Sequence, residues 1–315
     1  MSTDATDPTA PTVQPPAGGP RPADGVPAPR LEDRDGRAAV IVSRLLPHPP
    51  EEVWEGITRP VLLEPWFPGA PVFTLREGGT ARFPAFGEGP EGYGQMLEVE
   101  HGERLRFTWG GEEMTLDLRP EGDGTLLTIT QLGDDRPGAA SYATGWEACL
   151  EGLAQVLAGQ EVTDPGPRPA RHEELATAFG LDDPALAEDA QGWVLRWSRQ
   201  LVVPAETAWE LWLAGGDPAG HGPDPEINRP FRAPRAPEVV LGTITALDPP
   251  RLLVLEVDPA EPGDGLRVAT GEGTGHGTRL EVVLSGTDAA EREDGRAQWT
   301  AAVAGLAAAA LRRRD

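Results

Sequence analysis

Few side chains of this sequence are spaced for covalent or metal chemistry. The five histidines are His48, His101, His172, His221 and His276. They are widely separated, and none has a partner at the spacing of a metal site or a catalytic dyad. The chain has arginine but no lysine, which excludes a P-loop lysine and a Schiff-base lysine. The sequence therefore predicts no catalytic residue, no metal ligand and no cofactor.

The remaining patterns that suggest chemistry also have simpler explanations. Cys149, the single cysteine, lies beside an apolar helical stripe and is typical of a core residue. The glycine-rich run 271–275 lies between predicted strands, which favours a loop over a dinucleotide site. Glu112 shares a strand face with Met114, and in an acidic chain such a carboxylate favours a solvated surface over acid–base catalysis.

Composition narrows the possible partners. The formal net charge is −24, and phosphates are repelled by such a chain, so we expect neither nucleic acid nor an anionic membrane as a partner. No apolar run reaches the roughly 20 residues that span a bilayer. The start, Met1-Ser2-Thr3-Asp4, lacks the basic and apolar regions of a signal peptide. One cysteine fits a reducing compartment, and we expect a cytoplasmic protein.

Three blocks of the sequence occur twice in the same order. The segment around Trp54 returns around Trp209, a shift of 155 residues, and the Gly-Thr pair at 124–125 returns at 277–278, a shift of 153. A helical stripe also returns with a shift of 153: Trp146, Leu150, Leu153 and Leu157 become Trp299, Val303, Leu306 and Ala310. Solenoid units repeat every 20–50 residues or so, which makes this longer period typical of a duplicated domain.

Turn signals and apolar periodicity divide the chain into four parts. We expect a disordered Pro/Ala-rich tail over 1–36, a first domain over 37–160, a linker with a short helix over 161–191, and a second domain over 192–315. In each domain the pattern predicts a strand, one or two short helices, a series of strands and one long closing helix. The closing helices are expected over 139–158 and 296–312.

The first copy carries a family resemblance. The segment 44–58, followed by Trp66-Phe67, resembles the opening of the START-like, or SRPBCC, superfamily, and within it the AHSA1-like branch named for the activator of Hsp90 ATPase. The segments 93–99 and 104–109 and the pair Gly145-Trp146 are similar to later blocks of that family. The resemblance covers roughly residues 38–160. It implies an α+β fold of two helix-grip domains, each a curved antiparallel sheet wrapped around a long C-terminal helix.

The same resemblance implies an apolar cavity between sheet and helix. The side chains available to line it in the first copy are Trp66, Phe67, Phe83, Phe86, Tyr93, Met96, Phe107, Trp109, Met114, Tyr142 and Trp146. The second copy lacks the Trp-Phe pair and has Gly215-Gly216-Asp217-Pro218 in its place. This difference puts a pocket in the second copy in doubt and makes a packing partner an equal alternative. We therefore expect the ligand site in the first copy, near Trp66 and Phe67.

Three functions are compatible with these observations. The aromatic inventory and the missing catalytic constellation favour non-enzymatic binding of a small apolar or amphipathic molecule, in a stress-related or regulatory role. A polyketide aromatase/cyclase-like enzyme uses a duplicated version of the same superfold, but it needs polar groups that converge inside the cavity. The family name alone suggests a partner of Hsp90. Fold analogy does not decide between a small-molecule partner and a protein partner.

Overall fold

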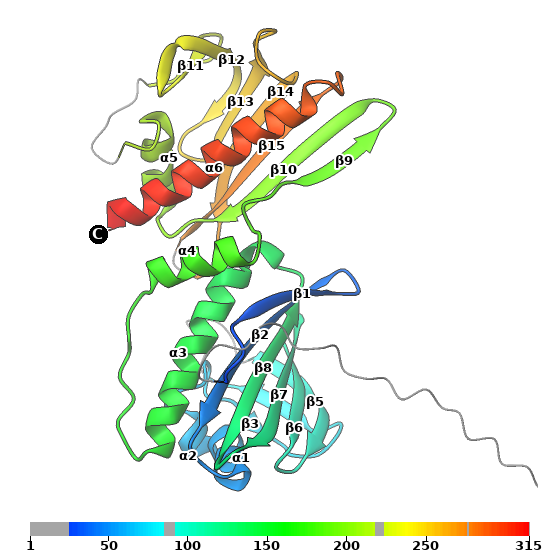
Figure 1. Ribbon diagram of the computed structural model, residues 1–315, viewed down its shortest axis with the longest axis vertical. Coiled ribbons are helices and arrows are strands. Elements are labelled where there is room, and N and C mark those ends of the chain that lie inside the picture. Colours follow the sequence, from blue (N-terminus) through cyan, green and yellow to red (C-terminus); the bar gives the residue numbers. More distant parts are fainter. Residues whose placement is uncertain (1–24, 85–91, 218–223, 276, 315) are drawn as a thin grey trace, which may run out of the picture.

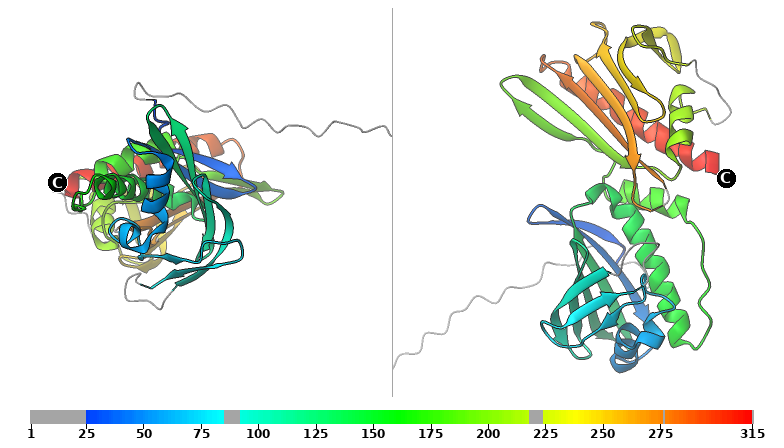
Figure 2. Two further views of the ribbon diagram at one scale, coloured as in Figure 1. Left: turned by 90° about the horizontal axis from the view of Figure 1, so that it is seen from below. Right: turned by 180° about the vertical axis from the view of Figure 1, so that it is seen from behind.

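The computed structural model describes residues 25–84, 92–217, 224–275 and 277–314. These residues form two α+β domains placed end to end, each with one antiparallel sheet and one long helix (Figure 1). The predicted fold class and the duplication are confirmed. Each long helix lies along one face of its own sheet, as the view from behind also shows (Figure 2, right). No described helix is long and apolar enough to cross a membrane.

The first sheet has the strand order β1-β2-β8-β7-β6-β5-β4-β3 among the described residues. Its strands are β1 (Arg30–Arg34), β2 (Arg37–Leu46), β3 (Val72–Phe73), β4 (Thr80–Phe83), β5 (Gly92–Glu100), β6 (Arg104–Trp109), β7 (Glu112–Glu121) and β8 (Gly124–Gly133). The helices of this domain are α1 (Pro50–Thr58), α2 (Pro60–Leu63), the 3-10 turn η1 (Arg136–Gly138) and α3 (Ala139–Leu157).

Local sequence explains where these helices begin and which face they bury. Pro50 opens α1, and Glu51 and Glu52 lie in its first turn, where negative charge is favoured. Along α3 the stripe residues Trp146, Leu150 and Leu153 are buried against the sheet, as their helical spacing predicts.

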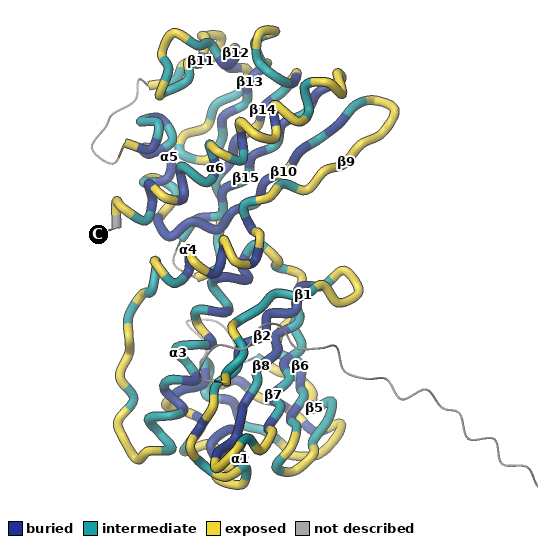
Figure 3. The backbone as a smooth tube through the Cα atoms, viewed as in Figure 1, coloured by how far each residue is buried: buried dark blue, intermediate teal, exposed yellow. Residues whose placement is uncertain are grey.

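The second sheet has the order β11-β12-β13-β14-β15-β10-β9. Its strands are β9 (Ala185–Asp189), β10 (Gly192–Gln200), β11 (Pro230–Ala233), β12 (Ala236–Asp248), β13 (Leu252–Val257), β14 (Gly265–Glu272) and β15 (Thr278–Gly286). The helices are α4 (Pro169–Ala178) between the domains, α5 (Ala205–Leu213) and the closing helix α6 (Arg292–Arg314). Buried residues line the inner side of both sheets, whereas β9 and the segment before α4 are largely exposed (Figure 3).

Two edge strands lie in segments that the sequence analysis placed outside the domains. β1 falls within the expected tail and β9 within the expected linker. The shift from Arg30 to Ala185 is the same 155 residues that separates Trp54 from Trp209, so the hairpin belongs to the duplicated unit. In the first copy the turn Asp35-Gly36 has positive φ at both residues, the geometry of a two-residue hairpin. Both edge strands are short and carry charged residues, which hides the apolar alternation that identifies a strand; β9 is exposed, whereas β1 is partly buried.

Polar contacts join the two domains. The guanidinium of Arg279 donates to both carboxylate oxygens of Asp135, at 2.9 and 3.1 Å. Thr274 also donates to Asp135, and Ser141 donates to the carbonyl oxygen of Thr274 at 3.0 Å. Arg199 of β10 also donates to Glu173 of α4, at 2.5 Å.

Candidate functional site

Most of the aromatic side chains predicted to line a cavity form one cluster in the first domain. Trp66, Phe67, Phe83, Met96, Phe107, Met114 and Trp146 are buried in its core, and Trp109 and Tyr142 are partly buried against it. The ring of Phe67 lies at the centre, with centroids 5.3 Å from Trp66, 5.4 Å from Trp146, 5.7 Å from Trp109 and 6.3 Å from Phe107. These rings fill the interior by packing on one another.

Two predicted lining residues lie elsewhere. Tyr93 is 63% exposed, because it shares the outward face of β5 with Gln95 while Met96 points inward. Phe86 lies outside the described residues.

A polar group that the sequence analysis missed lies beside the aromatic cluster. Gln131 is 4% exposed and accepts a hydrogen bond from the indole nitrogen of Trp146 at 2.5 Å. Its amide nitrogen donates to Glu112, also at 2.5 Å. Burial raises the pKa of Glu112, and hydrogen bonds from Gln131 and Tyr142 offset only part of that rise. Glu112 is thus half-buried rather than solvated, and the only advance signal was Gln131 inside an apolar strand.

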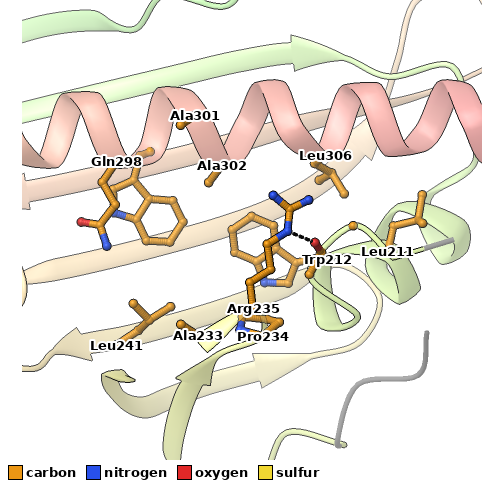
Figure 4. A pocket seen from close by; sticks show the side chains of 13 residues that line it. Leu211, Trp212, Ala233, Pro234, Arg235, Leu241, Gln298, Ala301, Ala302 and Leu306 are labelled. Atoms are coloured by element: carbon orange, nitrogen blue, oxygen red, sulfur yellow. Dashed lines mark hydrogen bonds between the residues drawn. The ribbon is translucent and has the colours of Figure 1, made fainter. Parts of the chain in front are cut away.

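A cavity lies in the second domain, between the helices α5 and α6 and the strands β11 and β12. Its volume is about 270 Å³ (Figure 4). The wall is mostly apolar and includes Leu211, Trp212, Leu241, Trp299, Ala302 and Leu306. The sequence analysis doubted a pocket in this half because aromatic residues are missing from the loop after α5. Small residues leave space that a Trp-Phe pair would fill, and Gly215 and Gly216 lie in this wall.

Two tryptophans form the aromatic part of the wall. The rings of Trp212 on α5 and Trp299 on α6 are stacked, with centroids 5.7 Å apart and an interplanar angle of 18°. Trp299 belongs to the repeated stripe of the closing helix, whereas the sequence analysis did not single out Trp212. The helical spacing of Trp209 and Trp212 was the available signal, since residues three apart share a face.

Among the described residues of this wall, Arg235 is the one that is ionisable. Its Nε donates to the carbonyl oxygen of Gly215, just beyond the C-terminus of α5 (Figure 4). Within the part of the chain that the structure describes, no carboxylate lies within 4.0 Å of Arg235. The indole nitrogen of Trp212 is buried and also has no hydrogen-bond partner there. The cavity thus combines an apolar aromatic wall with unpaired hydrogen-bond donors.

Comparison with known proteins bears on the first domain. Residues 47–158 match the family model described as Activator of Hsp90 ATPase homolog 1-like protein. They form an AHSA1-like domain. A comparison with curated proteins finds no match. The described part of the second domain repeats most of the order of elements of the AHSA1-like domain, without a helix in the place of α2 and with one strand fewer, and the family model does not extend to it.

Three solved structures illustrate the similarity. CalU16 from Micromonospora echinospora is 25% identical, with 49% of this chain and 94% of that chain covered and a TM-score of 0.38. DynU16, from the dynemicin biosynthetic locus, is 24% identical, with 86% and 98% covered and a TM-score of 0.37. CV1439 from Chromobacterium violaceum is 32% identical, with 38% and 96% covered and a TM-score of 0.31.

Proposed function

We propose that this protein binds a small apolar or amphipathic molecule without converting it, and that the cavity of the second domain holds the ligand. The observation that carries the proposal is the space of about 270 Å³ beside the stacked rings of Trp212 and Trp299. Small-molecule sites are typically concave, mostly apolar and equipped with a few polar groups. Burying an apolar ring against such a wall stabilises a complex by about 1–3 kcal/mol per side chain.

A cavity-filling variant tests this proposal directly. Ala302 lies in the wall on α6, so Ala302→Phe places a ring in the space that the ligand would occupy. Ala308→Phe is the matched control, because Ala308 is an exposed residue of the same helix. We expect naphthalenemethanol, titrated into the whole protein by calorimetry, to bind the unaltered chain and Ala308→Phe but not Ala302→Phe.

The same titration tests the site predicted near Trp66 and Phe67. The indole of Trp66 is buried and donates to the carbonyl oxygen of Gly56 at 3.1 Å, which ties it into the first-domain core. If Trp66→Ala abolishes binding while Ala302→Phe retains it, the ligand site belongs to the first domain and the proposal for the second is wrong.

A further inference from the structure

The second-domain cavity has a charged residue, Arg235, in addition to its apolar wall. The chain has 27 Lys and Arg residues against 51 Asp and Glu residues, so a carboxylate partner is readily available for most cations. Arg292 and Arg313, for example, each form an ion pair with a glutamate within the second domain, at 2.9 and 3.0 Å. Arg235 has no such partner among the described residues, although it lines the cavity. Arg235 is an exposed residue, so its guanidinium borders both solvent and the apolar space.

Glycines provide the place in which the Arg235 side chain lies. A Cβ atom added to Gly215 would come within 2.8 Å of Cγ of Arg235, and one added to Gly216 within 2.8 Å of its Nη2. A Cβ on Gly305, inside α6, would lie 3.5 Å from Nη1. Glycine within a helix costs about 1 kcal/mol relative to alanine. Gly215 and Gly216 thus leave room for the Arg235 side chain, and Gly305 lies at ordinary contact distance from its guanidinium.

Only part of this guanidinium is used by the fold. The bond from Nε to Gly215 satisfies a carbonyl group near the end of α5, which is an ordinary helix-capping role. Nη1 and Nη2 have no hydrogen bond or ion pair with any other described residue. A guanidinium with free terminal nitrogens pairs well with a carboxylate, because its planar donors match the two carboxylate oxygens.

We infer that the cavity selects small apolar molecules that carry one anionic group, such as an aromatic carboxylate, and that Arg235 is the residue that determines this selectivity. The ring would contact Trp212 and Trp299, and the carboxylate would accept hydrogen bonds from the terminal nitrogens of Arg235. This inference rests on the proposed function, because it assigns a ligand class to the same cavity. In a chain with a net charge of −24, a cation in the cavity wall without a carboxylate partner also attracts anions to that place.

A pair of probes with the same ring tests the inference. Naphthoate is anionic at pH 7 and naphthalenemethanol is neutral, and both are titrated into the whole protein by calorimetry. We expect naphthoate to bind about tenfold more tightly than the alcohol, the effect of a charge-assisted hydrogen bond at a partly exposed site. Arg235→Gln keeps a donor near Gly215 but removes the charge, and it should abolish the preference for naphthoate over the alcohol.

The control is Arg232→Gln, which removes the same charge from the exposed part of β11. It should keep the tenfold preference. Equal affinities of the unaltered protein for both probes, or a preference that survives Arg235→Gln, would overturn the inference and leave the proposed function intact. If neither probe binds, the proposed function fails and the inference fails with it.

Discussion

The closing helix of each domain has a glycine at the same position, and a different side chain lies beside that glycine in each domain. Gly152 of α3 and Gly305 of α6 are separated by 153 residues, the shift that also relates Trp146 to Trp299. A Cβ on Gly152 would lie 3.1 Å from Cβ of Trp66, whereas one on Gly305 would lie 3.5 Å from Nη1 of Arg235. The indole side chain of Trp66 thus lies beside the helical glycine in the first domain, and the guanidinium of Arg235 lies beside it in the second.

This difference shows where the two copies have diverged in function. Both helices keep the tryptophan and the glycine, so the helix alone does not decide whether the interior is open. The residues that reach the helix from the other elements decide it. In the first domain Trp66 and Phe67 follow α2 and fill the interior, and in the second Gly215 and Gly216 follow α5 and leave a cavity. Three predictions test this contrast between a filled and an open domain, and one concerns the buried carboxyl of the first domain.

The largest expected effect is on stability. Phe67→Ala should lower the free energy of unfolding by about 3–5 kcal/mol, because it removes the ring at the centre of a filled cluster. Trp212→Ala should cost about half of this or less, because Trp212 is partly exposed and borders space that is already empty. Urea denaturation followed by circular dichroism measures both. Equal losses would show that the second domain is packed as tightly as the first.

Adding a ring, rather than removing one, should also destabilise the first domain more than the second. Cys149 and Ala302 are separated by the same 153 residues, and Cys149 packs against the first core. Cys149→Phe should destabilise the protein by about 1–3 kcal/mol, because a close-packed interior has no room for the ring. Ala302→Phe should change stability by less than about 1 kcal/mol, since its ring enters a cavity. Thermal unfolding compares the two, and a larger loss for Ala302→Phe would contradict the contrast.

The buried carboxyl of the first domain predicts a pH effect. Burial raises the pKa of Glu112, so the folded protein holds this proton more tightly than the unfolded chain does. Stability from this group is therefore greatest below the ordinary Glu pKa and is lost as the pH rises through the raised value. Relative to Glu112→Gln, the unaltered protein should lose stability as the pH rises above the ordinary Glu pKa of about 4. Urea midpoints across this range measure the trend, with Glu100→Gln, at an exposed position, as control. A difference that is constant with pH would contradict the raised pKa.

The smallest expected effect concerns the helical glycines Gly152 and Gly305. Replacing a helical glycine by alanine stabilises by about 0.5–1 kcal/mol when the new methyl group has room. Gly305→Ala has room, at 3.5 Å from the nearest atom, and should raise the melting temperature. Gly152→Ala meets Cβ of Trp66 at 3.1 Å and Cγ1 of Val162 at 3.3 Å, so the gain should vanish or reverse. Similar changes in melting temperature for both variants would mean that the space beside the helical glycine is equally open in the two domains.

Much of the fold could be predicted because duplication doubles the evidence for each element. The repeated Trp54 and Trp209 place one buried helix in each copy, and the stripe beginning at Trp146 places the closing helix of the first. The edge strands β1 and β9 were missed because each has five residues with charged side chains among them and only one large apolar residue, Leu31 or Leu186, which leaves little alternation to detect. Their register follows from turn geometry and from pairing with β2 and β10, which sequence periodicity does not report.

The candidate site was less predictable for a physical reason. Residue type shows that a side chain is suited to contact a ligand, and it does not show whether neighbouring side chains leave space. Aromatic residues such as Phe67 favour both a core and a binding site, and here the structure packs them together. The cavity instead depends on glycines and on Arg235, whose role appears only when α5, β11 and α6 are brought together. The cavity is indicated by the lack of large side chains at a few positions, and the composition of the chain does not reveal such positions.

The polar contacts between the domains determine at which pH the two domains should separate. The cations described at this junction, Arg279 and Arg199, are guanidinium groups, which keep their charge throughout the physiological pH range. Burial alone would raise the pKa of Asp135, but hydrogen bonds from Arg279 and Thr274 outweigh it and lower that pKa. The stability that Asp135 contributes is therefore present above the ordinary Asp pKa and is lost only as the pH falls through the lowered value. Tyr142, near the same contact, has a pKa raised to about 12 by burial and by Glu112. The two halves should accordingly separate in strong acid well before they separate in base.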